Sequence, residues 1–256
     1  MAVVTFTTDF GAADAYTGAM KGVVLTLAPD AVLVDITHEI PRRDVRSGAL
    51  VLSQAAPYFP AGSIHVAVVD PGVGGARADL VVDAGDHVFV GPDNGILALA
   101  ARPPRSVFRI ENPLFRRDPA SPTFHGRDVF AVAAGRLAGG RPAKEAGSKM
   151  ASMVELDVAD SGPLGDEVRG AVVHVDRFGN LVTSFSGGRT EGHWQLSCGD
   201  QQFDLTGGRT FSDVARDSFV LYEGSSGRVE IAVRDGSAAA LMGAQAGTKF
   251  LLRRRS

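Results

Sequence analysis

The chain has 256 residues, 45% of them hydrophobic and 21% charged, which is enough for one large domain or two modest ones. Its 26 basic and 29 acidic residues give a net charge of -3, so no basic face argues for a nucleic-acid partner. Cys198 is the single cysteine, which excludes an intrachain disulfide and fits a reducing compartment. With no signal peptide or long apolar stretch at its start, we expect a cytoplasmic protein without a membrane partner.

The first half of the chain alternates strand and helix patterns. Strands are predicted at residues 3–7, 32–36 and 64–69, and a hairpin at 80–83 and 87–91. Helices are predicted at 15–27, 44–56 and 128–137, with Asp44 as a cap of the second. Continuous apolar strands that alternate with helices favour a parallel sheet covered on both faces.

The last third of the chain has a different pattern. Short strands are predicted at 172–176, 181–184, 202–205, 219–222, 229–233 and 249–252, with turn residues and no convincing helix between them. We therefore predict an α/β fold in which residues 1–165 form a mainly parallel sheet flanked by helices. Residues 166–256 form a smaller antiparallel β-barrel-like domain. The closing Arg253, Arg254 and Arg255 are interpreted as a solvated tail.

Two carboxylates follow predicted parallel strands, at the sheet edge where such folds bind ligands: Asp9 after the first and Asp70 after the third. Asp14 lies in the same first turn as Asp9, and either contacts a ligand or caps the helix that follows. From Asp70 to Arg77 the chain is rich in glycine, which lets the backbone approach a bound molecule. The alternative for that segment is a surface turn with an Asp70–Arg77 ion pair. It matches neither a P-loop nor a dinucleotide fingerprint.

Two further motifs combine polar and aromatic residues. Phe124 and His125 precede a predicted helix, where Asp128 is a possible cap and a possible partner of Arg127. Asp176 and Asn180 end the first strand of the second domain. Their motif, Asp176-Arg177-Phe178-Gly179-Asn180, is either a hairpin turn or a site for an amino-acid ligand, since an amide both donates and accepts hydrogen bonds.

A metal site is a weaker hypothesis. The candidate ligands are Asp9, His38, Glu39, Asp70 and His125, and none has a recognised ligand spacing. We expect no metal. A metal-dependent phosphoesterase built on Asp9, Asp70 and His125 stays open as an alternative activity.

Seven motifs, taken in order, resemble the SAM hydroxide adenosyltransferases, adenosine-forming S-adenosyl-L-methionine hydrolases related to bacterial fluorinase and chlorinase. They are Thr8-Asp9-Phe10-Gly11, Met20-Lys21-Gly22, His38-Glu39-Ile40-Pro41, Asp70-Pro71-Gly72-Val73-Gly74, Gly91-Pro92-Asp93-Asn94-Gly95, Phe124-His125-Gly126-Arg127-Asp128 and Asp176-Arg177-Phe178-Gly179-Asn180. The resemblance implies an N-terminal α/β domain, a C-terminal β domain and a homotrimer. The substrate would bind between the N-terminal domain of one subunit and the C-terminal domain of the next.

The same resemblance assigns roles. Asp70, Arg77 and His125 match the family's catalytic trio; the halogenating relatives have tyrosine in place of Asp70 and lack the other two, so the resemblance implies hydroxide as the nucleophile. The implied substrate contacts are Asp9 with the ribose, Asp176 and Asn180 with the methionine end, Phe124 and Phe211 along the site, Asp14, and Ser225 near the methionine carboxylate. No cofactor is implied.

Two departures concern the second domain: Gly224 and Arg234 stand where asparagine is common in the family. Besides the phosphoesterase, the alternative is a protein that binds S-adenosyl-L-methionine or adenosine without turnover.

Overall fold

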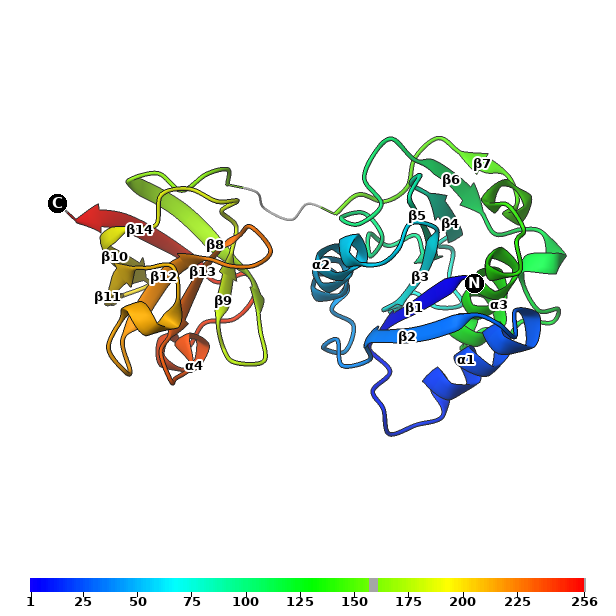
Figure 1. Cartoon of the computed structure of the whole chain (residues 1–256), viewed down its shortest axis with the longest axis horizontal. Helices are drawn as coiled ribbons and strands as arrows, with labels where there is room; N and C mark the ends of the chain where they lie inside the picture. The colour runs from blue at the N-terminus through cyan, green and yellow to red at the C-terminus, as the bar shows by residue number, and fades with distance from the viewer. Residues whose placement is uncertain (157–160, 256) are drawn as a thin grey trace. The chain divides into compact units, whose positions relative to one another are not determined.

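The computed structural model describes residues 1–156 and 161–255, in two compact units that comprise Met1–Leu156 and Asp157–Ser256 (Figure 1). The sequence prediction placed the division after residue 165, whereas the first unit ends at Leu156. Residues just before that point pack into the first unit, because Met153 is buried in its core and the Val154 N–H donates to Asp93 Oδ1 at 2.7 Å. Leu164 instead belongs to the core of the second unit.

The first unit contains a seven-stranded sheet. Its strands are β1 (Val3–Thr8), β2 (Val32–Thr37), β3 (Ser63–Val68), β4 (Asp79–Asp83), β5 (His87–Pro92), β6 (Ser106–Arg109) and β7 (Lys149–Met150). Their order is β2-β1-β3-β5-β4-β6-β7, and the first four are parallel while the rest pair antiparallel. This confirms the mainly parallel sheet and the β4–β5 hairpin. The short strands β6 and β7, of which β7 forms the edge of the sheet, were not predicted.

Helices cover both faces of this sheet. They are α1 (Tyr16–Leu27), α2 (Val45–Ala55), α3 (Ala131–Ala138), the short 3₁₀ turns η1 (Ala56–Tyr58), η2 (Pro113–Phe115) and η4 (Ala143–Ala146), and the π-helix η3 (Gly126–Phe130). Alternate residues of the strands point to opposite faces, so Val66 and Val68 of β3 join the core under α1 and α3, and Ala67 joins the core under α2. Figure 1 shows α2 on one side of the sheet, with α1 and α3 on the other.

The helix starts test three residues that the sequence offers as possible caps. Asp44 caps α2, with its Oδ1 accepting from the Ser47 N–H at 3.0 Å. Asp14 does not cap α1, which begins after Ala15 without a side-chain cap. The predicted cap at Asp128 is also wrong. The helical segment begins earlier, with the π-helix, and the Asp128 carboxylate instead accepts from the Ser121 N–H at 2.9 Å.

The second unit is a closed seven-stranded barrel, which confirms the predicted architecture. Its strands are β8 (Glu167–Val175), β9 (Leu181–Thr183), β10 (Gly192–Cys198), β11 (Gln201–Gly207), β12 (Phe219–Glu223), β13 (Val229–Val233) and β14 (Lys249–Arg255). All neighbours pair antiparallel except β11 and β12, which are parallel. The 3₁₀ turn η5 (Phe211–Asp213) lies in the connection between those two strands.

Two expectations for the second unit are wrong. A short helix, α4 (Ala238–Met242), is present where no helix was expected; Ser237 caps it, and Gly243 ends it at φ +60°. The three final arginines are part of β14 rather than a solvated tail, because this strand closes the barrel between β8 and β10. Arg253 pairs with Glu167 at 2.9 Å, and the Arg254 guanidinium lies 5.9 Å from the centre of the Trp194 ring.

Among the helices of the described ranges, none is long and apolar enough to cross a membrane.

Candidate active site

The predicted trio comes from two loops that touch. Asp70 lies just beyond β3 and Arg77 just before β4, so one loop carries both residues. His125 lies directly before the π-helix η3. Gly74, at the tip of the first loop, has φ +76°, and a Cβ there would lie 2.5 Å from the carbonyl oxygen of Pro122. A glycine is therefore required where the two loops meet.

Arg77 is the centre of this cluster. Its Nε donates to both carboxylate oxygens of Asp70, at 3.0 and 3.1 Å, and its Nη2 also bonds to Asp70 Oδ2. The same Nη2 lies 3.0 Å from His125 Nδ1. The guanidinium carbon is 5.5 Å from the centre of the Phe130 ring. The structure therefore brings Asp70, Arg77 and His125 together, and the Asp70–Arg77 ion pair that was the alternative interpretation is present as part of the same cluster.

Asp79 is a fourth member that the sequence analysis missed. Its Oδ1 pairs with Arg77 Nη1 and lies 3.2 Å from His125 Nδ1. Only 10% of its side chain is exposed. A signal was present in the sequence, because residues two apart at the start of a strand point to the same face, and Asp79 follows Arg77 by two positions.

The two carboxylates keep Arg77 charged. Burial disfavours its charged form, but the hydrogen bonds from Arg77 to Asp70 and Asp79, together with their negative charges, outweigh burial and raise the pKa of Arg77. The guanidinium is therefore a fixed cation in a largely buried position. A cavity of about 490 Å³ is lined by Arg77, Asp79 and His125, and its volume lies in the range of small-molecule sites.

Aromatic rings and Asp9 lie in the same unit. The Phe124 ring contacts Tyr16 and Phe10, with ring centres 5.2 and 6.1 Å apart. Asp9 follows β1, whose Thr8 pairs with Val68 of β3, so Asp9 and Asp70 leave neighbouring strand ends. Asp9 Oδ2 accepts from the Arg43 N–H at 2.9 Å. Asp14 is exposed, and among the described residues it forms no hydrogen bond or ion pair.

In the second unit, Asp176 and Asn180 are bonded to each other. Asp176 Oδ1 accepts from the N–H groups of Phe178 and Asn180, at 2.9 and 2.8 Å, and Asp176 Oδ2 accepts from Asn180 Nδ2 at 2.8 Å. Gly179 has φ +82° and stands against the side chain of Ser237. The motif is thus a tight turn, as one interpretation held, and it also presents a carboxylate and an amide side by side.

Phe211 and Ser225 are placed differently. The Phe211 ring lies 5.1 Å from the Tyr222 ring and is 42% exposed, whereas Ser225 lies in the exposed turn between β12 and β13. The Tyr222 hydroxyl donates to Glu230 Oε2 at 2.6 Å. Burial and the nearby charge of Asp176 raise the pKa of Glu230, despite the opposing hydrogen bond from Tyr222. Glu230 was not identified from the sequence.

The two departures from the family pattern have local explanations. A Cβ at Gly224 would lie 2.1 Å from Glu230 Oε1, so glycine leaves room for this carboxylate. Arg234 Nη1 donates to the Val214 carbonyl at 2.8 Å and anchors the chain just after η5, which carries Phe211.

Four of the candidate metal ligands, Asp9, His38, Asp70 and His125, have other partners. His38 Nδ1 bonds to Thr8 Oγ1 at 2.9 Å, and His38 Nε2 lies 3.0 Å from Asp35 Oδ1. Within residues 1–156 and 161–255, no group of three or more His, Cys, Asp or Glu side chains is placed to hold a metal ion.

Comparisons with known proteins match both units. Residues 4–147 match the SAM hydroxide adenosyltransferase N-terminal domain, and residues 170–251 match the SAM hydroxide adenosyltransferase C-terminal domain. The chain is 41% identical over 252 residues to an (R)-S-adenosyl-L-methionine hydrolase of Salinispora tropica, covering 96% of each protein. It is 39% identical over 259 residues to a protein of the same name from Thermus thermophilus, covering 96% of this chain and 98% of that protein.

More distant relatives and solved structures agree with this. A fluorinase of Nocardia brasiliensis is 24% identical over 211 residues, 71% of this chain and 70% of that protein. The crystal structure of an uncharacterized conserved protein from Thermotoga maritima superposes with a TM-score of 0.90 at 30% identity, covering 99% of this chain and 100% of the other. With both domains matched along most of their length, the chain belongs to the SAM hydroxide adenosyltransferase family.

Proposed function

We propose that this protein hydrolyses S-adenosyl-L-methionine to adenosine and L-methionine, by in-line attack of water or hydroxide on C5′ of the ribose. The names of its relatives at about 40% identity support this substrate, and they specify the R form. The observation that carries the proposal is the convergence of Asp70, Asp79 and His125 on the guanidinium of Arg77.

The chemistry needs an aligned nucleophile. The sulfonium makes methionine a good leaving group, so a C5′–O bond forms as the C5′–S bond breaks, and one proton is released from water. Arg77 supplies the positive charge that favours hydroxide character in a water molecule, a task that a metal performs in other hydrolases. Holding that water in line with C5′ contributes up to roughly 7–11 kcal/mol in well-ordered cases. The proposed reaction therefore uses neither a metal nor a cofactor.

His125 is suited to hold the released proton. Arg77 is always a donor, so the 3.0 Å contact with Nη2 requires His125 Nδ1 to be the acceptor when the ring is neutral. When Nδ1 carries a proton it donates to Asp79 Oδ1, 3.2 Å away. One nitrogen thus has a partner in each protonation state. In this scheme Asp79 is a positioning residue that acts through Arg77 and His125.

The remaining contacts are proposed from the family resemblance together with the geometry of each unit. Asp9 binds the ribose hydroxyls, Asp176 and Asn180 bind the methionine end, and Phe211 flanks the adenine. Asp14 and Ser225 are exposed, so both side chains are accessible to a substrate that is bound at the boundary with a neighbouring subunit. The trio and the Asp176–Asn180 pair belong to different units, so we propose a homotrimer in which neighbouring subunits complete each site, acting in the cytoplasm.

One assay tests the proposal. The purified protein is incubated with each sulfonium epimer of S-adenosyl-L-methionine in ¹⁸O-labelled water containing a chelator, and the products are separated by chromatography. We expect adenosine that carries the label at its 5′ oxygen, and no product with Arg77→Ala. Label elsewhere, full activity of Arg77→Ala, or loss of activity with the chelator would each contradict the mechanism, and binding of substrate without turnover would favour the non-catalytic alternative.

A further inference from the structure

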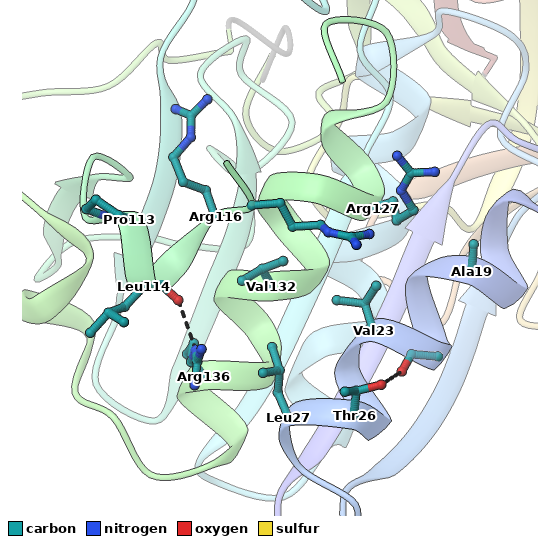
Figure 2. Close-up of a pocket in the computed structure, with 12 residues that line it drawn as sticks. Ala19, Val23, Thr26, Leu27, Pro113, Leu114, Arg116, Arg127, Val132 and Arg136 are labelled. Carbon is teal, nitrogen blue, oxygen red and sulfur yellow. Dashed lines mark hydrogen bonds between the residues drawn. The ribbon is translucent and has the colours of Figure 1, made fainter. Parts of the chain in front are cut away.

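A second cavity lies in the first unit, between helices α1 and α3 and the turn η2 (Figure 2). Its volume is about 620 Å³, within the range of small-molecule sites. We call it the arginine groove, because it is lined by Arg116, Arg117, Arg127 and Arg136. Nothing in the proposed hydrolysis uses it.

The groove has an apolar floor. Figure 2 shows Val23 and Leu27 of α1 between the two helices, facing Val132 of α3, with Leu114 at one end beside Arg136. The floor is open because α1 contributes Gly22 to the lining, and a Cβ built on Gly22 meets no atom within 4 Å. Glycine in a helix costs about 1 kcal/mol relative to alanine, and here it leaves a hollow rather than permitting a close contact.

The charge of the groove is strongly unbalanced. Its lining contains four guanidinium groups and no carboxylate. The nearest compensation is Asp128, which accepts from Arg127 Nε and Nη2 at 2.8 and 2.7 Å and lies 3.5 Å from Arg117 Nη1. One carboxylate cannot offset four cations, so the groove attracts an anion.

Donors remain for such an anion. Arg136 uses only its Nε, which donates to the Leu114 carbonyl at 2.9 Å, and this leaves both of its Nη groups. Arg116 forms no ion pair with any residue of the described ranges. Guanidinium groups bind phosphate oxygens through paired N–H donors, which suits several arginines around one ligand.

From these observations we infer that the arginine groove binds a phosphate monoester with an apolar or aromatic body. A phosphate monoester carries about -1.5 to -2 charges at pH 7, so it neutralises more of the excess positive charge than a single carboxylate does. Its carbon skeleton covers Val23, Leu27 and Val132. The groove borders the hydrolytic cavity and shares Arg116 with it, but Gly22, Val23, Leu27, Val132 and Arg136 line only the groove. The inference does not rest on the proposed function.

The test uses phenyl phosphate as the probe, measured by titration calorimetry on the full chain in the presence of saturating adenosine. Inorganic phosphate and phenol are the two half-probes. We expect phenyl phosphate to bind about tenfold more tightly than either, because only this probe engages both the guanidinium groups and the apolar floor. Failure of phenyl phosphate to bind, or no advantage over inorganic phosphate, overturns the inference. Displacement by adenosine also overturns it, because the probe then occupies the nucleoside site.

Two variants with matched controls locate the binding. Gly22→Leu fills the hollow and is compared with Gly18→Leu, on the same helix, where a Cβ also meets nothing and which does not line the groove. Arg136→Gln is compared with Arg102→Gln, since Arg102 also donates to a carbonyl through Nε, at 3.2 Å from Leu99 O, outside the groove. Each groove variant should weaken binding about tenfold, the loss of roughly 1.4 kcal/mol, and each control should leave it unchanged.

The same variants exclude a different occupant. If a second copy of the chain covers the groove, Gly22→Leu changes the oligomeric state in analytical ultracentrifugation and Gly18→Leu does not, and this result overturns the small-molecule site. Arg136→Gln keeps the test valid if Gly22→Leu fails to fold. Equal weakening by groove and control variants overturns the inference as well.

Discussion

Two arginine clusters of the first unit, the one around Arg77 and the arginine groove, differ in how far the protein itself neutralises their positive charge. Arg77 is shared by two carboxylates and an imidazole and is only 10% exposed. In the groove, one carboxylate pairs with two of the four guanidinium groups, and the Arg117 side chain is 57% exposed. The first cluster is satisfied by the protein itself, whereas the second is left with unused donors.

The difference separates two uses of the same side chain. A guanidinium held by fixed partners cannot reorient, so its charge acts on a reacting molecule without reorganisation. A guanidinium without fixed partners gains free energy only when a ligand arrives. Partner count and burial thus distinguish an arginine placed for chemistry from one placed for binding, and substitutions in the two clusters should have different consequences.

The largest effect is expected for Arg77→Lys, which keeps the charge and loses the fork that contacts Asp70, Asp79 and His125. We expect kcat/KM for S-adenosyl-L-methionine hydrolysis to fall about 10²–10³-fold, as for the loss of a preorganised donor. Arg109→Lys is the control, since Arg109 lines the same cavity without contacting the trio, and its effect should be far smaller. Comparable losses in the two variants would contradict the central place of Arg77.

Asp79→Asn should reduce kcat about tenfold to a hundredfold with little change in KM, because Asp79 positions Arg77 and His125 without touching substrate. Asp83→Asn, at the other end of β4, is the control, where the carboxylate accepts from the Gly85 N–H at 3.0 Å and lies outside the catalytic cluster. A rise in KM with an unchanged kcat for Asp79→Asn would contradict this positioning role.

Asp128→Asn removes the carboxylate that pairs with Arg127 beside the groove. It should lower the free energy of unfolding at pH 7 by about 2–3 kcal/mol, because Arg127 loses a buried partner. The hydrogen bond from Arg127 lowers the pKa of Asp128 below 3.8 even though burial opposes this. Its stabilising effect is therefore complete above pH 3.8 and is lost as pH falls further.

Urea denaturation of wild type and Asp128→Asn from pH 7 to pH 3 measures this effect. The difference in the free energy of unfolding between wild type and Asp128→Asn should become smaller toward pH 3. Asp86 is exposed, so Asp86→Asn is the control, and its free energy of unfolding should equal that of wild type at every pH. A gap that is constant with pH would show that the stabilisation does not come from the ionised carboxylate.

The smallest effect on hydrolysis is expected for Arg136→Gln. Among the described residues, the Arg136 side chain hydrogen-bonds to the Leu114 carbonyl and to no member of the catalytic cluster, so kcat and KM should equal those of wild type while phenyl phosphate binding is weakened. Steady-state kinetics on the protein used for calorimetry provide the check. A parallel loss of activity would mean that the two clusters are not independent.

Much of the fold follows from local patterns, and the exceptions have identifiable causes. Alternation and apolar runs predicted β1, β2, β3 and the β4–β5 hairpin, because each buries a continuous face. The strand β10 and the helix α4 were missed, since their short segments are stabilised by barrel closure and by the Ser237 cap rather than by a long periodic pattern. The final arginines were interpreted as a tail because their place in a strand depends on pairing with β10, which the local sequence does not show.

The site was predictable where family motifs cover it, and less so elsewhere. Asp70, Arg77 and His125 were identified through motifs and lie together, and their roles in catalysis stay a prediction. Asp79 and Glu230 escaped notice because their importance depends on contacts between distant segments, with His125 and Arg77 in one case and Tyr222 in the other. The π-helix was also unforeseen, since the sequence of η3 fits an ordinary helix.

The apposition of Gly74 and Pro122 matters for any attempt to move this chemistry into another scaffold. Because main-chain atoms, and not the reacting side chains, set the spacing between the two loops, transplanting Asp70 to Arg77 alone would leave His125 at an uncontrolled separation. A successful graft would have to carry residues 118–125 as a paired module.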